Sequence, residues 1–203
     1  MLAVLMLSLF ASCSGDKTSD EEDTAIRAAF DEAYTVATLF SGYAANVYAD
    51  GSIEVEYDSE YSPTLQYDRF SLCSTMSELS EMVELYFSDE IGETLMATEA
   101  RPGAPLYLEK DGVLYRFGGF VSLYAVDTEY IEIVSVTKES DDKFTVSVKA
   151  EYPDFYGEEL ATVTHDYTCE KIDGVYKFTG EFPLLADIAI DEMLDDRMLL
   201  PLG

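Results

Sequence analysis

The sequence predicts an α+β fold, in which a curved antiparallel sheet is packed with one long N-terminal helix and two short helices. A helical apolar period runs through residues 24–47, and two shorter periodic segments follow between residues 75 and 96. After residue 105, short apolar runs alternate with turn signals. The order of one helix, two strands, two helices and then several consecutive strands is typical of an α+β domain with an antiparallel sheet.

Residues 1–12 predict a secretory signal peptide. They are apolar apart from two serines, carry no charge, and are too few to span a bilayer, which takes about 20 apolar residues. The small residues Ala11 and Ser12 before Cys13 resemble a bacterial lipobox, in which the cysteine is acylated and becomes the new N-terminus. The segment departs from that pattern because it lacks an initial Lys or Arg and has Phe10 where leucine is usual. We expect Cys13 to carry a lipid; a cysteine buried in an N-terminal core helix is the alternative.

Residues 13–23 predict the lipidated cysteine followed by a flexible acidic tether, because residues 14–23 are polar and charged and show no apolar period. Residues 24–203 then form a single α+β domain, a length that suits one hydrophobic core. The domain begins with its longest helix, at residues 24–47, and we expect the apolar stripe of this helix to lie in the core. The stripe consists of Ile26, Phe30, Ala33, Ala37, Phe40, Ala44 and Val47.

Two strands and two short helices come next. A strand is expected over residues 53–57, where apolar residues alternate with glutamates, and a second strand near residues 65–71. Thr75 and Glu78 have the capping-box spacing at the start of the first short helix. Ser88 is expected to accept backbone N–H groups as the N-cap of the second.

The second half of the chain predicts antiparallel hairpins. The first joins residues 106–108 to residues 113–115 through Lys110-Asp111-Gly112, a tight-turn signal between two apolar runs. The other strand pairs are residues 131–137 with 144–150, and residues 161–170 with 175–179. A weakly amphipathic pattern within residues 180–203 predicts a closing helix over an exposed sheet edge.

The composition is that of a globular, strongly acidic protein. Hydrophobic residues make up 48% and aromatic residues 13%, and 41 Asp and Glu against 12 Lys and Arg give a formal net charge of −29. Such a charge disfavours nucleic acids and anionic wall polymers, because binding them requires Lys and Arg to displace counterions. It favours a basic protein partner or divalent cations. The alternative is that the charge only keeps an exported protein soluble.

The sequence contains no catalytic motif and predicts no cofactor and no metal site. His165 is the only histidine, and it alternates with apolar residues and Cys169 along a strand, which indicates a place at the core or its rim. Once Cys13 is assigned to a lipid, Cys73 and Cys169 remain. They either form a disulfide, which an exported chain permits, or stay as buried free thiols. Two cysteines and one histidine so widely spaced do not make a zinc site.

Four motifs occur in a set order along the chain. They are Ser-Thr-Met-Ser-Glu-Leu at residues 74–79, Tyr-Phe-Ser-Asp-Glu-Ile at 86–91, Asp-Gly-Val-Leu-Tyr at 111–115 and Asp-Gly-Val-Tyr-Lys-Phe at 173–178. In this order they resemble the IseA-type DL-endopeptidase inhibitor family of Gram-positive bacteria, which includes lipoproteins. The chain departs from that family at Gly118-Gly119-Phe120, where an arginine-glycine turn is common.

The resemblance implies an exported, non-enzymatic protein that is lipid-anchored at the extracellular face of the bacterial cytoplasmic membrane. It would inhibit NlpC-type cysteine peptidases, which cut peptidoglycan stem peptides, by occluding the active-site cleft, so a cell-wall hydrolase is the implied partner. The candidate contact residues are Gly118, Gly119 and Phe120, with Asp111 and Tyr115 on the adjacent hairpin. Ordinary turn and sheet residues are the alternative interpretation of these positions.

A second hypothesis is a lipoprotein that binds a small molecule or wall fragment in a cystatin-like or nuclear-transport-factor-like cone fold. It predicts a deep apolar cavity, lined by Tyr and Phe, between the sheet and the long helix. An enzyme comes last, since it would need His165 or a pair of carboxylates exposed in a cleft with a perturbed pKa.

Overall fold

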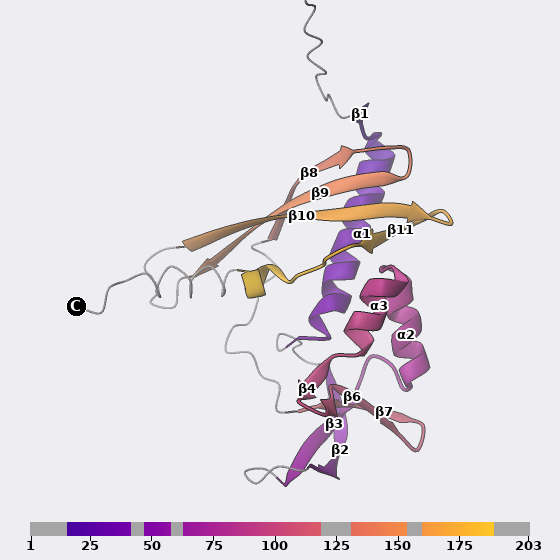
Figure 1. Cartoon of the computed structure of the whole chain (residues 1–203), viewed down its shortest axis with the longest axis vertical. Coiled ribbons are helices and arrows are strands. Elements are labelled where there is room, and N and C mark those ends of the chain that lie inside the picture. Colours follow the sequence, from indigo (N-terminus) through magenta and orange to yellow (C-terminus); the bar gives the residue numbers. More distant parts are fainter. Residues whose placement is uncertain (1–15, 42–46, 58–62, 119–130, 154–159, 189–203) are drawn as a thin grey trace, which may run out of the picture.

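Two antiparallel sheets lie at opposite ends of a long helix, with two short helices beside it (Figure 1). The computed structural model describes residues 16–41, 47–57, 63–118, 131–153 and 160–188. In chain order its elements are β1 (Asp16–Lys17), α1 (Asp20–Thr38), β2 (Tyr48–Glu56), β3 (Thr64–Phe70), α2 (Met76–Glu84), α3 (Asp89–Met96), β4 (Glu99–Arg101), β5 (Ala104–Pro105), β6 (Tyr107–Lys110), β7 (Val113–Phe117), β8 (Ile131–Lys138), β9 (Lys143–Pro153), β10 (Leu160–Ile172) and β11 (Val175–Thr179).

The predicted α+β class is confirmed, and the strands divide into separate sheets. A five-stranded sheet has the order β1-β8-β9-β10-β11, and a four-stranded sheet has the order β2-β3-β7-β6. The small pair β4-β5 forms a third, two-stranded sheet beside the four-stranded one. Helix α1 packs its N-terminal half on the five-stranded sheet and points its C-terminal end at the four-stranded sheet (Figure 1).

Helix α1 begins earlier than predicted because Ser19 and Glu22 form a capping box. The Ser19 hydroxyl accepts a hydrogen bond from the Glu22 N–H (3.2 Å), and the Glu22 carboxylate accepts one from the Ser19 N–H (3.4 Å). Four acidic residues follow the cap in the first turn, where the helix dipole favours negative charge. The four charged residues at the end of the predicted tether, residues 20–23, are therefore the first turn of the helix.

Strand β1 lies just ahead of α1 and pairs with β8, with Asp16 opposite Lys138 and Lys17 opposite Thr137. The prediction of a flexible tether over residues 13–23 is thus wrong from residue 16 onward. The predicted signal peptide and Cys13 lie outside the described residues.

Helix α1 ends at Thr38 and not at residue 47. Val47 is buried, with 5% of its surface exposed, but its carbonyl accepts a hydrogen bond from the Ser71 N–H (2.8 Å) at the end of β3. The apolar spacing that extended the predicted helix therefore reflects burial beside a sheet. Ala44 lies outside the described residues.

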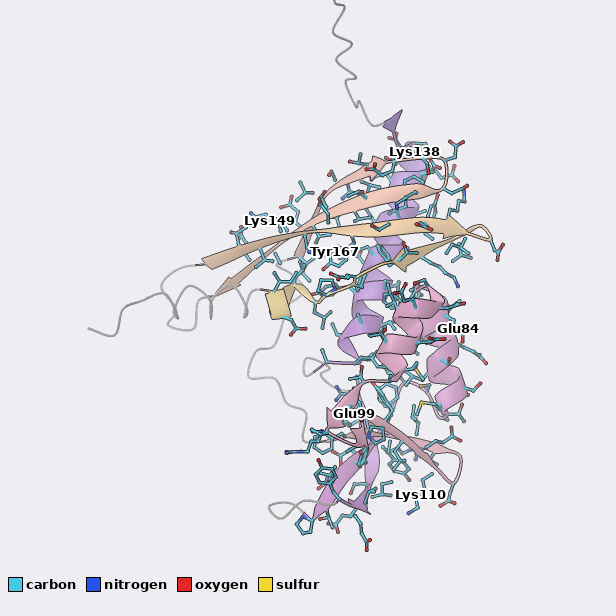
Figure 2. The ribbon with its side chains drawn as sticks, in the orientation of Figure 1. Glu84, Glu99, Lys110, Lys138, Lys149 and Tyr167 are labelled. Atoms are coloured by element: carbon cyan, nitrogen blue, oxygen red, sulfur yellow. The ribbon has the colours of Figure 1, made fainter. Side chains whose placement is uncertain are left out.

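Aromatic rings fill the interface between α1 and the five-stranded sheet. The Phe30 ring lies 5.1 Å from the Tyr167 ring and 5.7 Å from the Phe178 ring, and Phe182 lies 4.7 Å from Tyr167. Figure 2 shows Tyr167 between β10 and the helix. The Tyr34 hydroxyl accepts a hydrogen bond from the Leu185 N–H (3.0 Å) at a helical turn over residues 185–188, the only part of the predicted closing helix within the described residues.

The predicted hairpins are confirmed, and two of them use the same turn. Asp111 and Asp173 have φ angles of 54° and 52°, and the glycines that follow them have φ angles of 72° and 83°. Two consecutive residues with positive φ suit a two-residue hairpin, and Asp-Gly adopts this conformation readily. One such turn ends the β6–β7 hairpin and the other ends the β10–β11 hairpin.

The short helices α2 and α3 are joined to the five-stranded sheet through Phe87. The Phe178 N–H donates to the Tyr86 carbonyl (2.7 Å), and the Ser88 N–H donates to the Phe178 carbonyl (2.9 Å). Thr75 caps α2 as predicted, because its side chain accepts from the Glu78 N–H (3.2 Å). Ser88 occupies the N-cap position of α3, but its side chain makes no capping hydrogen bond, so that part of the prediction is wrong.

Arg116 is a buried cation at the junction of α1 and the four-stranded sheet. Its guanidinium donates to the Leu39 carbonyl (3.1 Å), to the Ser41 carbonyl and to the Tyr48 hydroxyl, and none of its surface is exposed. It also lies 5.9 Å from the centre of the Tyr107 ring. Carbonyls at a helix C-terminus lack intrahelical partners and carry partial negative charge, so this arginine both satisfies and neutralises the end of α1.

Replacing Arg116 with methionine is expected to lower the free energy of unfolding by about 2–4 kcal/mol, because buried carbonyls lose a charged donor. Arg69→Met is the matched control: Arg69 is exposed on the neighbouring strand β3, and its loss should change stability by no more than about 0.5 kcal/mol. Urea unfolding followed by circular dichroism measures both. Equal stabilities of the two variants would contradict this role of Arg116.

Candidate partner-binding site

The β6–β7 hairpin carries the first part of the predicted site. Asp111 lies at its tip, where it is exposed together with Lys110 and Gly112. Figure 2 places Lys110 at the end of the molecule away from the five-stranded sheet. A charged tip that projects from the body is accessible to a concave partner without any rearrangement of the core.

Tyr115 lies on β7, opposite Leu108 of β6 and opposite Arg69 of β3. Directly paired residues of antiparallel strands share one face of the sheet, so these three side chains belong to the same face. Tyr115 is half-buried there, whereas the side chain of its neighbour Arg116 lies on the opposite face and is fully buried. The tyrosine therefore has part of its ring available at the surface.

Gly118 follows β7 and is held against β3. Its N–H donates to the Gln66 carbonyl (3.1 Å), and a Cβ atom at this position would lie 2.0 Å from the Asp68 Oδ2 atom. The Asp68 carboxylate accepts a hydrogen bond from the Gln66 side-chain amide (2.7 Å), which fixes it beside the glycine. Only glycine fits here while Asp68 keeps this position.

A hollow of about 280 Å³ opens beside Gly118. Arg101 forms part of its wall and lies 5.8 Å from the centre of the Phe117 ring. Asp68 lines the same hollow, so one exposed cation and one carboxylate flank the start of the predicted contact loop. Sequence reasoning missed both residues; the available signal was an arginine just before Pro102-Gly103 in a chain with few basic residues.

The structure spreads the predicted contact residues along one strand. Asp111 and Gly118 lie at opposite ends of β7, which has five residues, and at about 3.4 Å per residue they are on the order of 20 Å apart. Gly119 and Phe120 lie outside the described residues. We use the name hairpin surface for Asp111, Tyr115 and Gly118 together; Asp68, which pairs with Arg116 and so lies on the face opposite Tyr115, and Arg101 line the hollow beside Gly118.

The two described cysteines are free thiols, so the alternative of free thiols holds in this structure, and the disulfide does not form. Cys169 lies on β10 of the five-stranded sheet, whereas Cys73 lies near Tyr107 of the four-stranded sheet. Burial raises the pKa of Cys169 to about 12 and that of Cys73 to about 11, with a smaller contribution from the neighbouring Glu78 carboxylate at Cys73.

His165 lies at the rim of the core, as its alternation predicts. Its ring packs edge-on against the Tyr167 ring, with 4.7 Å between the centres. It belongs to the five-stranded sheet, while Cys73 precedes α2, and a thiol with a pKa of about 11 is protonated at neutral pH. This arrangement counts against a cysteine–histidine catalytic pair.

The described part of the chain contains neither a candidate metal site nor a candidate membrane-spanning helix. Within it, no group of three or more His, Cys, Asp or Glu side chains is placed to hold a metal ion. No helix in the described ranges is both long and apolar enough to cross a membrane.

Comparison with known proteins assigns no family. No protein-family model matches the chain, and no curated protein matches it. The resemblance to the endopeptidase inhibitors thus remains based on four short motifs. The structure places one of these motifs at the α2 cap, one at the junction of α2 and α3, and the other two at the turns with Asp111 and Asp173.

The raised thiol pKa values predict slow alkylation. In the Cys13→Ser chain at pH 8, a thiol with a pKa of about 11 is ionised in roughly one molecule in a thousand, so iodoacetamide should label Cys73 and Cys169 at least about tenfold more slowly than in urea. Intact-mass spectrometry measures the labelling. Failure to label in urea without a reductant would reveal a disulfide and contradict the structure.

Gly118→Ala is expected to destabilise the domain by about 1 kcal/mol, because the new methyl group forces Asp68 to give up its hydrogen bond with Gln66. In an Asp68→Ala background the same substitution should lower the free energy of unfolding by less than about 0.5 kcal/mol. Urea unfolding of the four proteins completes the double-mutant cycle. An identical cost in both backgrounds would show that Asp68 does not set the space at Gly118.

Proposed function

We propose that this chain is a non-enzymatic protein that binds cell-wall DL-endopeptidases of the NlpC type and inhibits or regulates them by covering the active-site cleft. The observation that carries the proposal is the hairpin surface, in which an exposed tip with Asp111 and a half-buried tyrosine lead along β7 to the glycine that begins the predicted contact loop. A projecting hairpin has the shape that enters a cleft. The order of the four sequence motifs supports the same family of partners.

The net charge of the whole chain favours a basic partner. The chain carries a formal net charge of −29, and such a field accelerates encounters with a positively charged enzyme and weakens as salt rises. The contact itself then depends on shape at the hairpin. Association should therefore be fastest at low ionic strength.

In this proposal Cys13 carries the lipid that holds the domain at the outer face of the cytoplasmic membrane. Strand β1 begins at Asp16, so the link between lipid and fold spans at most about 11 Å. The domain would sit directly at the membrane surface, within reach of enzymes that work on the innermost wall.

The alternative of a small-molecule carrier with a cone-shaped fold has less support. That hypothesis needs a deep apolar cavity between the long helix and the sheet. In the described residues this space is occupied by the packed rings of Phe30, Tyr34, Tyr167, Phe178 and Phe182. The hollow that remains between α1 and the start of β8, about 360 Å³ beside Phe30 and Tyr34, is also lined by Asp31 and Thr35 and is therefore partly polar, not the deep apolar cavity that this hypothesis needs.

The test mixes the Cys13→Ser chain with an NlpC-type DL-endopeptidase and follows the release of stem-peptide fragments from peptidoglycan. We expect cleavage to fall with increasing inhibitor, and a complex to co-elute in size-exclusion chromatography at low salt. Asp111→Asn should raise the inhibitor concentration needed by about two- to fivefold, the effect of one exposed charge pair.

Asp173→Asn is the matched control, because Asp173 has the same backbone conformation in the other hairpin. It removes the same charge and should leave inhibition unchanged. Uninhibited cleavage together with no complex at low salt would reject the proposed function for that enzyme.

A further inference from the structure

A second hollow lies away from the hairpin surface, between α2 and α3, and has a volume of about 510 Å³. The helices approach closely at Gly92, where a Cβ atom would lie 3.4 Å from a Val83 methyl group. Small side chains on α2, Ser77 and Ser80, keep the groove open. A volume of this size accommodates a long side chain with its flanking backbone.

A residue of the groove carries a polar atom without a partner. Ser88 is one of the residues that line the groove, and its Oγ atom is buried and has no hydrogen-bond partner in the described structure. Leaving a buried hydroxyl unpaired costs about 1–3 kcal/mol. As the Ser88 hydroxyl does not cap α3, a rotation about its Cα–Cβ bond that exposes Oγ to the groove would let it accept a hydrogen bond from a ligand.

The charge around the groove is entirely negative. Its lining contains the carboxylates of Glu84, Asp89 and Glu93 and no Lys or Arg. Figure 2 shows Glu84 on the helix pair, in the last turn of α2, which has no basic residue. The C-terminal end of α2 favours a cation, whereas the N-terminal end of α3 at Ser88 and Asp89 disfavours one, so the attraction comes from the three carboxylates.

Thioether and aliphatic groups complete the lining. Met76 and Met96 bring flexible, polarizable side chains, and Val83 adds an apolar contact. Lysine and arginine combine an aliphatic stem with a cationic head, and they place the stem on apolar surface and the head among polar groups. The groove offers both kinds of surface.

We infer that the α2–α3 groove is a binding site for a lysine or arginine side chain of a peptide segment. The cationic head lies among Glu84, Glu93 and the Ser88 hydroxyl, and the stem contacts Met76, Met96 and Val83. The identification of that segment as part of a cell-wall hydrolase rests on the proposed function; the chemistry of the groove does not.

The test is a titration of the isotopically labelled Cys13→Ser chain with acetyl-Ala-Arg-Ala-amide, followed by the backbone amide signals of Ser88 and Gly92 in NMR spectra. Saturable shifts of these signals are expected with the arginine peptide and not with acetyl-Ala-Glu-Ala-amide. No saturable shift with the arginine peptide, or equal shifts with both peptides, would overturn the inference.

Two sets of variants make the test specific. Glu84→Gln with Glu93→Gln should weaken peptide binding at least fivefold, whereas Glu81→Gln with Glu90→Gln removes the same charge from the same helices outside the groove and should change binding less than twofold. Equal weakening by both pairs would reduce the effect to general charge and overturn the site.

Ser88→Ala separates binding from folding. It removes the unpaired buried hydroxyl, so the midpoint of urea unfolding should stay the same or rise, while the peptide dissociation constant should rise two- to threefold. An unchanged dissociation constant would remove Ser88 from the site. Because no hydrolase is present in these titrations, failure of the groove and failure of the proposed function are separate results.

Discussion

The fold depends on the buried guanidinium of Arg116 at the C-terminal end of α1. The helix has acidic residues at its start, which stabilise its N-terminal end. It has no basic residue in its last turn, so its own sequence provides no cation for the C-terminal carbonyls. Arg116 comes from β7 and supplies that cation across the interface. Because β7 also carries Tyr115 and leads to Gly118, the same contact fixes the hairpin surface relative to the long helix.

This arrangement suits a protein that presents a rigid surface. The rings around Phe30 hold α1 on the five-stranded sheet, and Arg116 holds its other end on the four-stranded sheet. The hairpin tip and the α2–α3 groove then occupy fixed places on one acidic body. A preorganised surface loses little conformational entropy on binding, which is an advantage for a protein that acts by occupying a site.

Local signals predicted local structure well. The Asp-Gly turns at Asp111 and Asp173 and the cap at Thr75 follow from a few neighbouring residues, and each is confirmed. The capping box at Ser19 has the same kind of signal, but its acidic surroundings resemble a tether. The apolar spacing that reaches Val47 could not distinguish a helix from burial beside a strand.

Features that depend on contacts between distant parts of the chain could not be predicted from the sequence. The division into two sheets depends on which strands pair, and alternation within each strand is the same for either arrangement. From the sequence alone Arg116 could be interpreted only as a charged residue of a strand, because its partners Leu39 and Ser41 are far away in the chain. Asp68 and Arg101 could not be predicted as part of the candidate site for the same reason, because their contacts with Gly118 and Phe117 join parts of the chain that are distant in sequence.

Hydrogen–deuterium exchange of the Cys13→Ser chain, with and without an NlpC-type DL-endopeptidase, tests the central claim most directly. The account predicts slower exchange over residues 107–118 in the complex; protection confined to the five-stranded sheet, with residues 107–118 unchanged, would contradict it.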